Sequence, residues 1–287
     1  MAALAMRDLY GLFGDPVDHS LSPDIQAIAF STLARQAAYL PFHVPAGDLA
    51  AAFTAARTLH MKGFNVTIPH KEKAAELADA LDGDAASIKA VNVVANREGK
   101  LVGFNTDTIA VTKSLDKIKF AIAGQRALVL GAGGAARAAA YALGRAGASE
   151  VVVANRTFSR ARELCAMLAG LGIEAVASPA SVNALREMVP MSQIVVNATS
   201  VGLKSPDDSP LPATVDFDPA AVAIDMVYRP LKTRFLQQAR EQGVQTIDGL
   251  DILIQQAIGS LSIWLNRTID AGRLVPVMRA AGLEALL

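Results

Sequence analysis

Hydrophobic residues follow two alternating patterns along the chain: short apolar runs, and longer stretches in which apolar positions recur with the helical period. Short apolar runs bounded by Gly or Pro are typical of buried strands, and the longer stretches are typical of amphipathic helices. Strand and helix patterns that alternate in this way predict an α/β fold with a mostly parallel sheet. In the N-terminal third, the expected strands are 9–14, 39–44 and 63–68, and the expected helices are 22–36 and 47–59.

The pattern changes between residues 90 and 107. Two apolar runs there flank the stretch "NREGK", whose composition is typical of a turn, and together they predict a β-hairpin. A helical pattern follows to about residue 119, and the strand–helix alternation then begins again. Further strands are expected at 127–130, 150–155, 173–178, 193–199, 222–228 and 244–248, and two closing helices at 249–266 and 274–287.

The restart of the alternation near residue 110 predicts a second α/β domain. The two closing helices are long and apolar, so we expect them to pack back on the first domain. With 287 residues, 52% of them hydrophobic, the chain is large enough to build two cores. The predicted domains are therefore 1–108 plus 250–287, and 109–249.

Composition excludes several classes of function. Lys and Arg total 27, as do Asp and Glu, and no basic stripe is present, so we expect no nucleic-acid partner. No apolar run reaches the roughly 18 residues of a membrane span. The single Cys165 excludes an internal disulfide and fits a reducing cytoplasm. The four histidines, at 19, 43, 60 and 70, are too dispersed to predict a metal site, and the oligomeric state is open between monomer and homodimer.

A glycine-rich turn, "VLGAGGAAR", lies between an apolar strand and an Ala-rich helix. Glycine also serves ordinary tight turns, but here the strand–turn–helix context and the second strand at 150–155 favour a dinucleotide site. Such a site needs backbone that approaches a pyrophosphate closely at a helix N-terminus. We expect the cofactor to contact Gly131, Ala132, Gly133, Gly134 and Ala135, with Ala136 where a third glycine is common.

The end of the second strand indicates which dinucleotide is bound. NAD sites usually offer a carboxylate to the ribose hydroxyls, whereas this strand ends in "NRTFSR". Arginine binds phosphate through its charge and planar fork, and Thr157 can cap the next helix and donate a hydroxyl. Although the same residues would also suit a solvated helix start, they favour NADP. The predicted contacts to its 2′-phosphate and ribose are Asn155, Arg156, Thr157 and Arg160.

Lys71 follows the apolar strand and Pro69 in the stretch "NVTIPHKEK". A lysine in this position is either a solvated charge at a helix start or a group directed into a cleft. Asp107 also lies just past an apolar strand, so the two side chains can meet in a cleft. A lysine beside a reacting hydroxyl can transfer its proton and stabilise developing alkoxide charge, while an aspartate orients it.

Nine short motifs in this order give the chain a resemblance, over nearly its whole length, to shikimate dehydrogenase and its quinate/shikimate dehydrogenase paralogues. The resemblance implies a first domain that binds a polyhydroxylated cyclohexene carboxylate, a Rossmann-like middle domain that binds NADP, and a cleft between the two. The motifs are "HSLSP", "NVTIPHKE", "AVN", "NTD", "GAGGAAR", "NRTFSR", "NATSVG", "DMVY" and "DGL" with the glutamine that follows it.

The resemblance also implies roles for single residues. Ser20 and Ser22 would bind the substrate carboxylate at the start of a helix, where Ser22 is also the expected N-cap, with Pro23 in the first turn. Lys71 and Asp107 would be the catalytic acid/base pair. The remaining substrate contacts would be Asn65, Thr67, Asn92, Tyr228 and Gln256, and the nicotinamide would lie near Asn197, Thr199, Ser200, Met226 and Gly249. His70, by contrast, is expected to be a packing or rim residue.

Several positions differ from the commonest pattern of the family. They lie around the expected pocket and leave the proposed reacting groups unchanged. A paralogue that acts on quinate, an aminated analogue or another hydroxy acid is therefore an alternative, as is a non-catalytic NADP-binding sensor, which would not need both Lys71 and Asp107. The differing residues are Lys89, Val93, Phe104, Thr108, Asp251 and Ile252.

Overall fold

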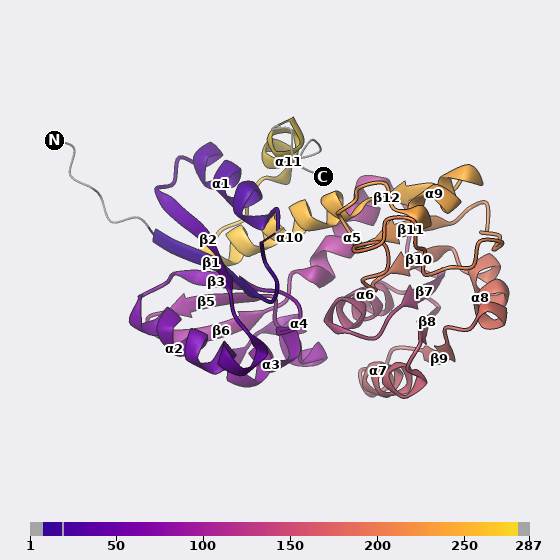
Figure 1. Ribbon diagram of the computed structural model, residues 1–287, viewed down its shortest axis with the longest axis horizontal. Helices are drawn as coiled ribbons and strands as arrows, with labels where there is room; N and C mark the ends of the chain where they lie inside the picture. The colour runs from indigo at the N-terminus through magenta and orange to yellow at the C-terminus, as the bar shows by residue number, and fades with distance from the viewer. Residues whose placement is uncertain (1–7, 19, 281–287) are drawn as a thin grey trace. The chain divides into compact units, whose positions relative to one another are not determined.

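Two separate β-sheets organise the chain in the computed structural model, which describes residues 8–18 and 20–280 (Figure 1). His19 and the end of the last predicted helix, 281–287, lie outside the described residues. The first unit comprises the described residues up to Thr106 together with those from Gln256 onward, and the second unit is Asp107–Gln255. The predicted α/β class and the division into two domains are confirmed.

The first unit is built on a mixed six-stranded sheet in the order β2-β1-β3-β5-β6-β4. Its strands are β1 (Asp8–Gly14), β2 (Ala37–His43), β3 (Gly63–Val66), β4 (Ala80–Leu81), β5 (Val93–Arg97) and β6 (Lys100–Phe104). Only β5 runs against the others, so the sheet is mostly parallel, as predicted. The predicted hairpin is β5–β6, in which Arg97 pairs with Lys100 across a two-residue turn.

The helices of the first unit surround an aromatic core. They are α1 (Ser22–Thr32), η1 (Ala46–Asp48), α2 (Leu49–Thr58), α3 (Lys71–Leu77), α4 (Gly83–Ile88), the end of α10 (Gly249–Trp264) and α11 (Ala271–Ala280). Phe64 of β3 is fully buried; its ring stacks on that of Phe13 at 4.4 Å between centroids and meets the edge of Phe53 at 5.1 Å. Through this cluster α2 packs against the centre of the sheet. Polar residues are therefore expected at the carboxyl ends of β1 and β3.

The second unit contains a six-stranded sheet in which every neighbouring pair is parallel. Its strands are β7 (Arg126–Leu130), β8 (Glu150–Asn155), β9 (Ala175–Pro179), β10 (Ile194–Asn197), β11 (Val222–Asp225) and β12 (Gln245–Ile247). Their order is β12-β11-β10-β7-β8-β9. The order reverses between β7 and β10, as in the Rossmann fold of dinucleotide-binding proteins.

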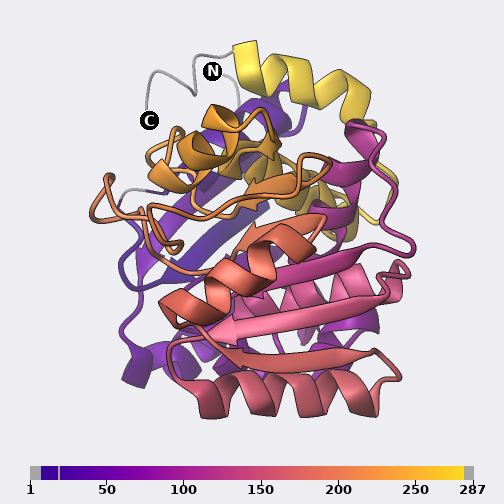
Figure 2. The same cartoon turned by 90° about the vertical axis from the view of Figure 1, so that its right-hand side faces the viewer.

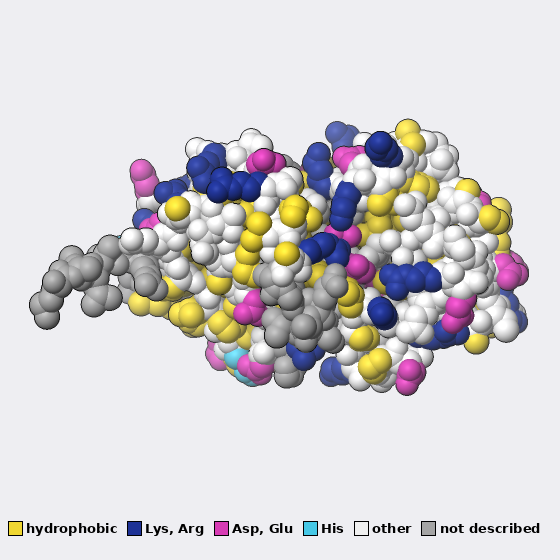
Figure 3. All heavy atoms as spheres, turned by 90° about the horizontal axis from the view of Figure 1, so that it is seen from above, with side chains coloured by type: hydrophobic (Ala, Val, Ile, Leu, Met, Phe, Trp, Pro, Cys, Tyr) yellow, Lys and Arg dark blue, Asp and Glu magenta, His cyan; other side chains and the backbone are white. Residues whose placement is uncertain are grey.

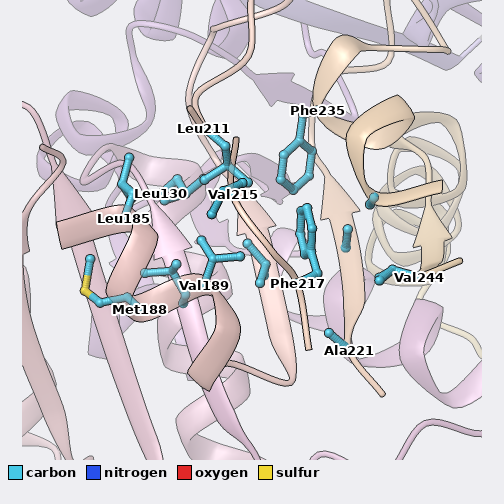
Figure 4. Packing of buried hydrophobic residues seen from close by; sticks show 14 of the residues in the cluster. Leu130, Leu185, Met188, Val189, Leu211, Val215, Phe217, Ala221, Phe235 and Val244 are labelled. Atoms are coloured by element: carbon cyan, nitrogen blue, oxygen red, sulfur yellow. The ribbon is translucent and has the colours of Figure 1, made fainter. Parts of the chain in front are cut away.

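The helices of the second unit are α5 (Asp107–Lys117), α6 (Gly134–Arg145), α7 (Phe158–Gly170), α8 (Val182–Met188), η2 (Val189–Met191) and α9 (Arg234–Glu241). Figure 2 shows α7 alongside β9 at the edge of the sheet. A large apolar cluster joins α8, η2, α9 and the segment before β11 to the sheet (Figure 4). Within this cluster the ring centroids of Phe217 and Phe235 lie 6.4 Å apart. Strands covered by such apolar contacts have few positions left for chemistry except their ends.

Sequence periodicity located most of the strands and the long helices, and it missed several short elements. The strands at 9–14, 63–68 and 150–155 are found within a few residues of their predicted bounds, whereas β4, α4, α8 and α9 were not predicted. These four elements have two to eight residues, too few for a clear apolar period. Cys165 lies in α7 and is buried.

Basic and acidic side chains are interspersed on the face drawn in Figure 3, in keeping with the even charge balance of the sequence. Within residues 8–18 and 20–280, no helix has the length and hydrophobicity needed to cross a membrane. The same residues contain no group of three His, Cys, Asp or Glu side chains arranged to hold a metal ion.

Lys89, one of the residues that differ from the family pattern, ends α4 in the left-handed conformation, with φ +49° and ψ +46°. This conformation brings Cβ close to the following carbonyl and favours glycine. We therefore expect Lys89→Gly to raise the free energy of unfolding of the first unit by roughly 0.5–1 kcal/mol, and its melting temperature by about 2 °C. Differential scanning calorimetry measures both.

Lys89→Ala is the matched control, because it removes the exposed side chain and keeps the left-handed cost. An equal gain in the alanine variant would mean that the lysine side chain, not the backbone, destabilises this turn.

Candidate active site

The point at which the strand order of the second sheet reverses lies between β7 and β10. In open parallel sheets, ligands bind in the crevice outside the carboxyl ends of the strands at such a point. Two of the predicted cofactor segments follow these strands: the glycine turn after Leu130 and the stretch that begins at Asn197. The Ala198 amide donates to the Leu130 carbonyl at 2.9 Å, so the two segments lie side by side.

The glycine turn meets two different spatial demands. Gly131 has φ +115°, and a Cβ built there would lie 2.9 Å from the Ala198 carbonyl oxygen, so the neighbouring loop excludes a side chain. Gly133, the N-cap of α6, has an extended backbone, and a Cβ there would meet nothing within 4 Å. The open space beside Gly133 lies at a helix N-terminus and fits the pyrophosphate of a dinucleotide.

The carboxyl end of β8 presents the predicted residues for the 2′-phosphate. Arg156, Thr157 and Arg160 are exposed, and the Asn155 side-chain amide donates to the Thr157 carbonyl at 2.9 Å. Thr157 occupies the N-cap of α7, as expected, but its side chain makes no capping hydrogen bond. The strand end therefore offers cationic and hydroxyl groups and no carboxylate, which fits a phosphorylated ribose.

A buried polar network connects the ends of β10 and β11. Asp225, the last residue of β11, is fully buried and accepts hydrogen bonds from the Asn197 side-chain amide at 3.0 Å, the Val227 amide at 2.9 Å and the Thr233 hydroxyl at 2.6 Å. The Asn197 side-chain oxygen in turn accepts from the amide and hydroxyl of Thr199 at 3.1 and 2.7 Å. Asn197, Thr199 and Met226 were predicted from the sequence, whereas Asp225 and Thr233 were not. The aspartate of "DMVY" was the available signal.

Gly249, at the start of α10, contacts the loop that follows β11. A Cβ at Gly249 would lie 2.3 Å from the Val227 carbonyl oxygen and 2.6 Å from the Tyr228 amide nitrogen. Both are backbone atoms, so a side chain cannot be accommodated without moving the loop. The predicted residues Met226, Tyr228 and Gly249 are thus brought together, while Asp251 pairs with Lys117 of α5 at 2.8 Å.

In the first unit, the backbone brings Thr67, Lys71 and Asn92 together. The Thr67 amide donates to the Phe13 carbonyl at 2.9 Å, which fixes the end of β3 against β1. Lys71 is half-buried at the start of α3, and its carbonyl accepts from the Val91 amide at 2.8 Å. The start of α3 is therefore tied to the chain immediately before Asn92.

The side chains of Asn65 and Asn92 make the hydrogen bonds that hold these segments together. The Asn65 side-chain amide donates to the Asn92 carbonyl at 3.0 Å and to the Ser260 hydroxyl of α10 at 2.9 Å. The Asn92 side chain accepts from the Thr106 amide at 2.8 Å and donates to the Thr106 hydroxyl at 3.1 Å. Thr106 also donates to the Gln256 carbonyl at 3.3 Å, so the predicted residues of the first unit share one network with α10.

Asp107, the predicted partner of Lys71, is the first residue of α5 and is fully buried. It directly follows Thr106, whose amide and hydroxyl bond to the Asn92 side chain. Asp107 belongs to the second unit and Lys71 to the first, and their pairing stays a prediction.

The expected capping role of Ser22 is wrong. Leu21 occupies the N-cap of α1, Ser22 is the first helical residue, and the Ser22 amide donates to the Ser20 hydroxyl at 3.2 Å. The Ser20 side chain thus lies at the helix start. His70 is buried, and its Nε2 lies 2.6 Å from the Val44 carbonyl oxygen, which confirms the packing role expected for it.

Both halves of the chain match models of known families. Residues 12–94 match the shikimate dehydrogenase substrate binding domain, and residues 113–204 match shikimate / quinate 5-dehydrogenase. The chain belongs to the shikimate dehydrogenase family. A shikimate dehydrogenase (NADP(+)) from Moorella thermoacetica is 42% identical over 279 residues, which cover 96% of this chain and 94% of the relative.

Solved structures of family members superpose on nearly the whole chain. A shikimate 5-dehydrogenase from Thermus thermophilus, in complex with NADP(H) and shikimate, is 38% identical with a TM-score of 0.83, covering 96% of this chain and 99% of the other. A ligand-free 5-ketofructose reductase of Gluconobacter is 33% identical with a TM-score of 0.82, over the same shares of the two chains.

Substitution of the two glycines of the cofactor turn should affect different properties: cofactor affinity for Gly133 and stability for Gly131. Gly133→Ala should weaken NADPH binding at least tenfold, because its Cβ enters the space in which the pyrophosphate is expected. It should leave the melting temperature unchanged, because its backbone is extended and no atom lies near the new Cβ. Titration calorimetry and thermal unfolding measure the two effects.

Gly131→Ala is the comparison, since its positive φ and its contact with Ala198 predict a clear loss of stability. A destabilised Gly133→Ala variant, or one that binds NADPH normally, would contradict this account of the turn.

Burial of Asp225 predicts a dependence of stability on pH. Desolvation raises the pKa of this carboxyl to about 6, although its hydrogen bonds to Thr233, Val227 and Asn197 lower it. Because the folded state then holds the proton more tightly than the unfolded state, whose pKa is near 3.8, this group makes the free energy of unfolding fall as the pH rises from about 4 to about 6.

The contribution is isolated by comparison with Asp225→Asn, which cannot titrate. The difference in unfolding free energy between wild type and variant should change by about 2 kcal/mol between roughly pH 4.5 and 7 in favour of the variant. Urea unfolding at several pH values measures it, and a difference that stays constant would contradict the raised pKa.

Proposed function

We propose that this protein is an NADP-dependent oxidoreductase that interconverts shikimate and 3-dehydroshikimate by hydride transfer. The full-length likeness to the Moorella thermoacetica shikimate dehydrogenase (NADP(+)) carries the proposal. It is supported by the strand order of the second unit, by the open space beside Gly133, and by the arginines after β8.

In the proposed reaction, bound NADP accepts the hydride from the carbon that carries the reacting hydroxyl. Lys71, as the neutral amine, takes the hydroxyl proton, and its ammonium form returns the proton to the carbonyl oxygen in the reverse direction. Asp107 orients Lys71 and balances its charge. The half-buried position of Lys71 and the burial of Asp107 support this assignment, because charges act more strongly where water is excluded.

The other assignments belong to the same proposal. Ser20 and Ser22 would bind the substrate carboxylate at the start of α1, and Thr67, Asn92, Tyr228 and Gln256 would contact the ring. The Asn65 side-chain amide already donates both of its protons within the first unit, and its oxygen accepts from the Tyr39 hydroxyl at 2.9 Å. Its remaining contribution to a substrate is the second lone pair of that oxygen. The cofactor residues are those predicted after β7, β8 and β10, together with Met226 and Gly249.

The 5-ketofructose reductase supports a second candidate, reduction of a different carbonyl substrate. The ketosugar in its name has no carboxylate, yet this chain is 33% identical to that reductase over nearly the whole length. Residues that differ from the common family pattern, among them Val93 and Thr108, directly follow the proposed substrate contact Asn92 and the proposed catalytic residue Asp107.

A panel of shikimate, quinate and 5-ketofructose, each assayed with NADP(H) and NAD(H), decides between the candidates. The proposal expects the highest kcat/KM for shikimate with NADP. A higher value for 5-ketofructose would establish the second candidate. NADPH binding without turnover of any substrate would favour the non-catalytic sensor.

Small molecules are the only partners in this proposal. We expect the protein to be a monomer or a homodimer in the cytoplasm. Analytical ultracentrifugation of the purified protein tests the oligomeric state.

Lys71→Ala should lower kcat roughly 10²- to 10⁴-fold, the usual contribution of a positioned acid/base. NADPH affinity should survive, because the glycine turn lies in the other unit. Lys73→Ala is the matched control: Lys73 lies on the same helix, is exposed, and pairs with Glu76 at 2.6 Å. Near-normal turnover of Lys71→Ala would make Lys71 a solvated helix-start charge and refute the mechanism.

Arg156→Ala should weaken NADP binding roughly 10- to 100-fold, because a charge-assisted hydrogen bond to phosphate contributes about 1.5–3 kcal/mol. NAD binding should change little, since NAD lacks the 2′-phosphate. Arg162→Ala, which removes an exposed arginine within α7, is the control. If Arg156→Ala weakened both cofactors equally, the arginine would not be reading the 2′-phosphate.

A further inference from the structure

The proposed reaction makes no use of Asp225, although this carboxylate is fully buried at the end of β11. A buried carboxylate is costly unless donors satisfy it, and here three donors do. From this geometry we infer that Asp225 is a positioning residue, which holds the loops after β10 and β11 in the arrangement that receives the nicotinamide half of the cofactor. This inference rests on the proposed function, which puts the nicotinamide beside Asn197–Ser200 and Met226.

The two carboxylate oxygens of Asp225 accept hydrogen bonds from different segments of the chain. Oδ1 accepts from the Asn197 side chain at 3.0 Å and from the Val227 amide at 2.9 Å, so one atom joins the loop after β10 to the loop after β11. Oδ2 accepts from the Thr233 hydroxyl at 2.6 Å, and Thr233 is the N-cap of α9. The carboxylate thus links three segments that are separate in sequence.

The effect of Asp225 extends along the loop after β10 through Asn197. With its amide held by Asp225 and by the Val201 carbonyl at 3.2 Å, Asn197 directs its oxygen to Thr199. The Thr199 hydroxyl then accepts from the Val201 amide at 3.1 Å. These bonds fix the segment that is proposed to contact the nicotinamide.

The loop after β11 is held from two sides. The Met226 amide donates to the Asn197 carbonyl at 3.0 Å, and the Val227 amide donates to Asp225. On the other side Gly249 lies against the Val227–Tyr228 peptide. Loss of the Asp225 acceptors would leave the Asn197 and Val227 donors unsatisfied, and both loops would have to shift to find new partners.

Only part of the cofactor site depends on this network. The hydrogen bonds that join Asp225 to Asn197, Val227 and Thr233 do not involve the residues proposed for the adenosine half, at the end of β8. Adenosine 2′,5′-bisphosphate carries the 2′-phosphate but no nicotinamide, so it reports on that half alone. A comparison of the two ligands separates positioning of the nicotinamide from general damage to the unit.

The experiment measures the affinity of Asp225→Ala for NADPH and for adenosine 2′,5′-bisphosphate by titration calorimetry. We expect NADPH affinity to fall about tenfold or more, while the affinity for the bisphosphate changes less than about twofold. Asp225→Asn should recover most of the NADPH affinity, because its amide oxygen still accepts from Asn197 and Val227 while its amide group donates to the Thr233 hydroxyl. In turnover, kcat/KM for NADP should fall.

Asp218→Ala is the matched control, since Asp218 also accepts from a side-chain amide and a backbone amide but lies before β11, at the opposite end of the strand. Both of its affinities should match wild type. Equal losses for the two ligands in Asp225→Ala, or an unchanged NADPH affinity, would overturn the inference. The binding arms need no turnover, so a protein that binds NADPH and reduces no panel substrate would refute the proposed reaction and still test Asp225.

If Asp225→Ala does not fold, Thr233→Val decides. It removes the donor to Oδ2 and preserves the shape of the side chain, so NADPH affinity should fall about threefold with no change for the bisphosphate. Thr233→Ser keeps the hydroxyl and should behave as wild type. An unchanged NADPH affinity in Thr233→Val would then overturn the inference.

Discussion

Buried strands that end inside a protein leave polar groups which must find partners away from water, and both units of this chain meet that constraint in the same way. In the second unit, Asn197 and Asp225 at neighbouring strand ends bond to each other and to the loops that follow. In the first unit, Asn65 and Asn92 do the same for the ends of β3 and β5 and for α10. The same side chains that complete the fold therefore set the loops on which the chemistry depends.

The two sheets separate stability from function. Strands covered by apolar clusters, such as those around Phe64 and Phe235, provide rigid supports, and the proposed contacts to substrate and cofactor lie at or just beyond the strand ends. The glycine turn after β7 likewise combines a structural role with a proposed binding role. Gly131 allows the neighbouring loop to approach, and Gly133 leaves space for a ligand. Both requirements concern the absence of a side chain, for different reasons.

The structure shows the local surroundings of two residues that depart from the common family pattern, Lys89 and Asp251. Lys89 retains the left-handed turn that glycine would favour, and Asp251, in the first turn of α10, pairs with Lys117 in the last turn of α5. An acidic side chain is favourable at a helix N-terminus and a basic one at a helix C-terminus, so this pair suits both helices. For Asp251 the structure thus gives a role in joining two helices of the second unit.

The sequence by itself determined the α/β class, the long strands and helices, the hairpin, the glycine turn and the cationic end of β8, because each depends on residues close together in the chain. Only the tertiary structure decided the reversal of strand order between β7 and β10 and the convergence of Asn197, Asp225 and Thr233. Hydrogen bonds between distant segments leave no period or spacing in the sequence. They exist only once parallel strands have brought their carboxyl ends to a common edge.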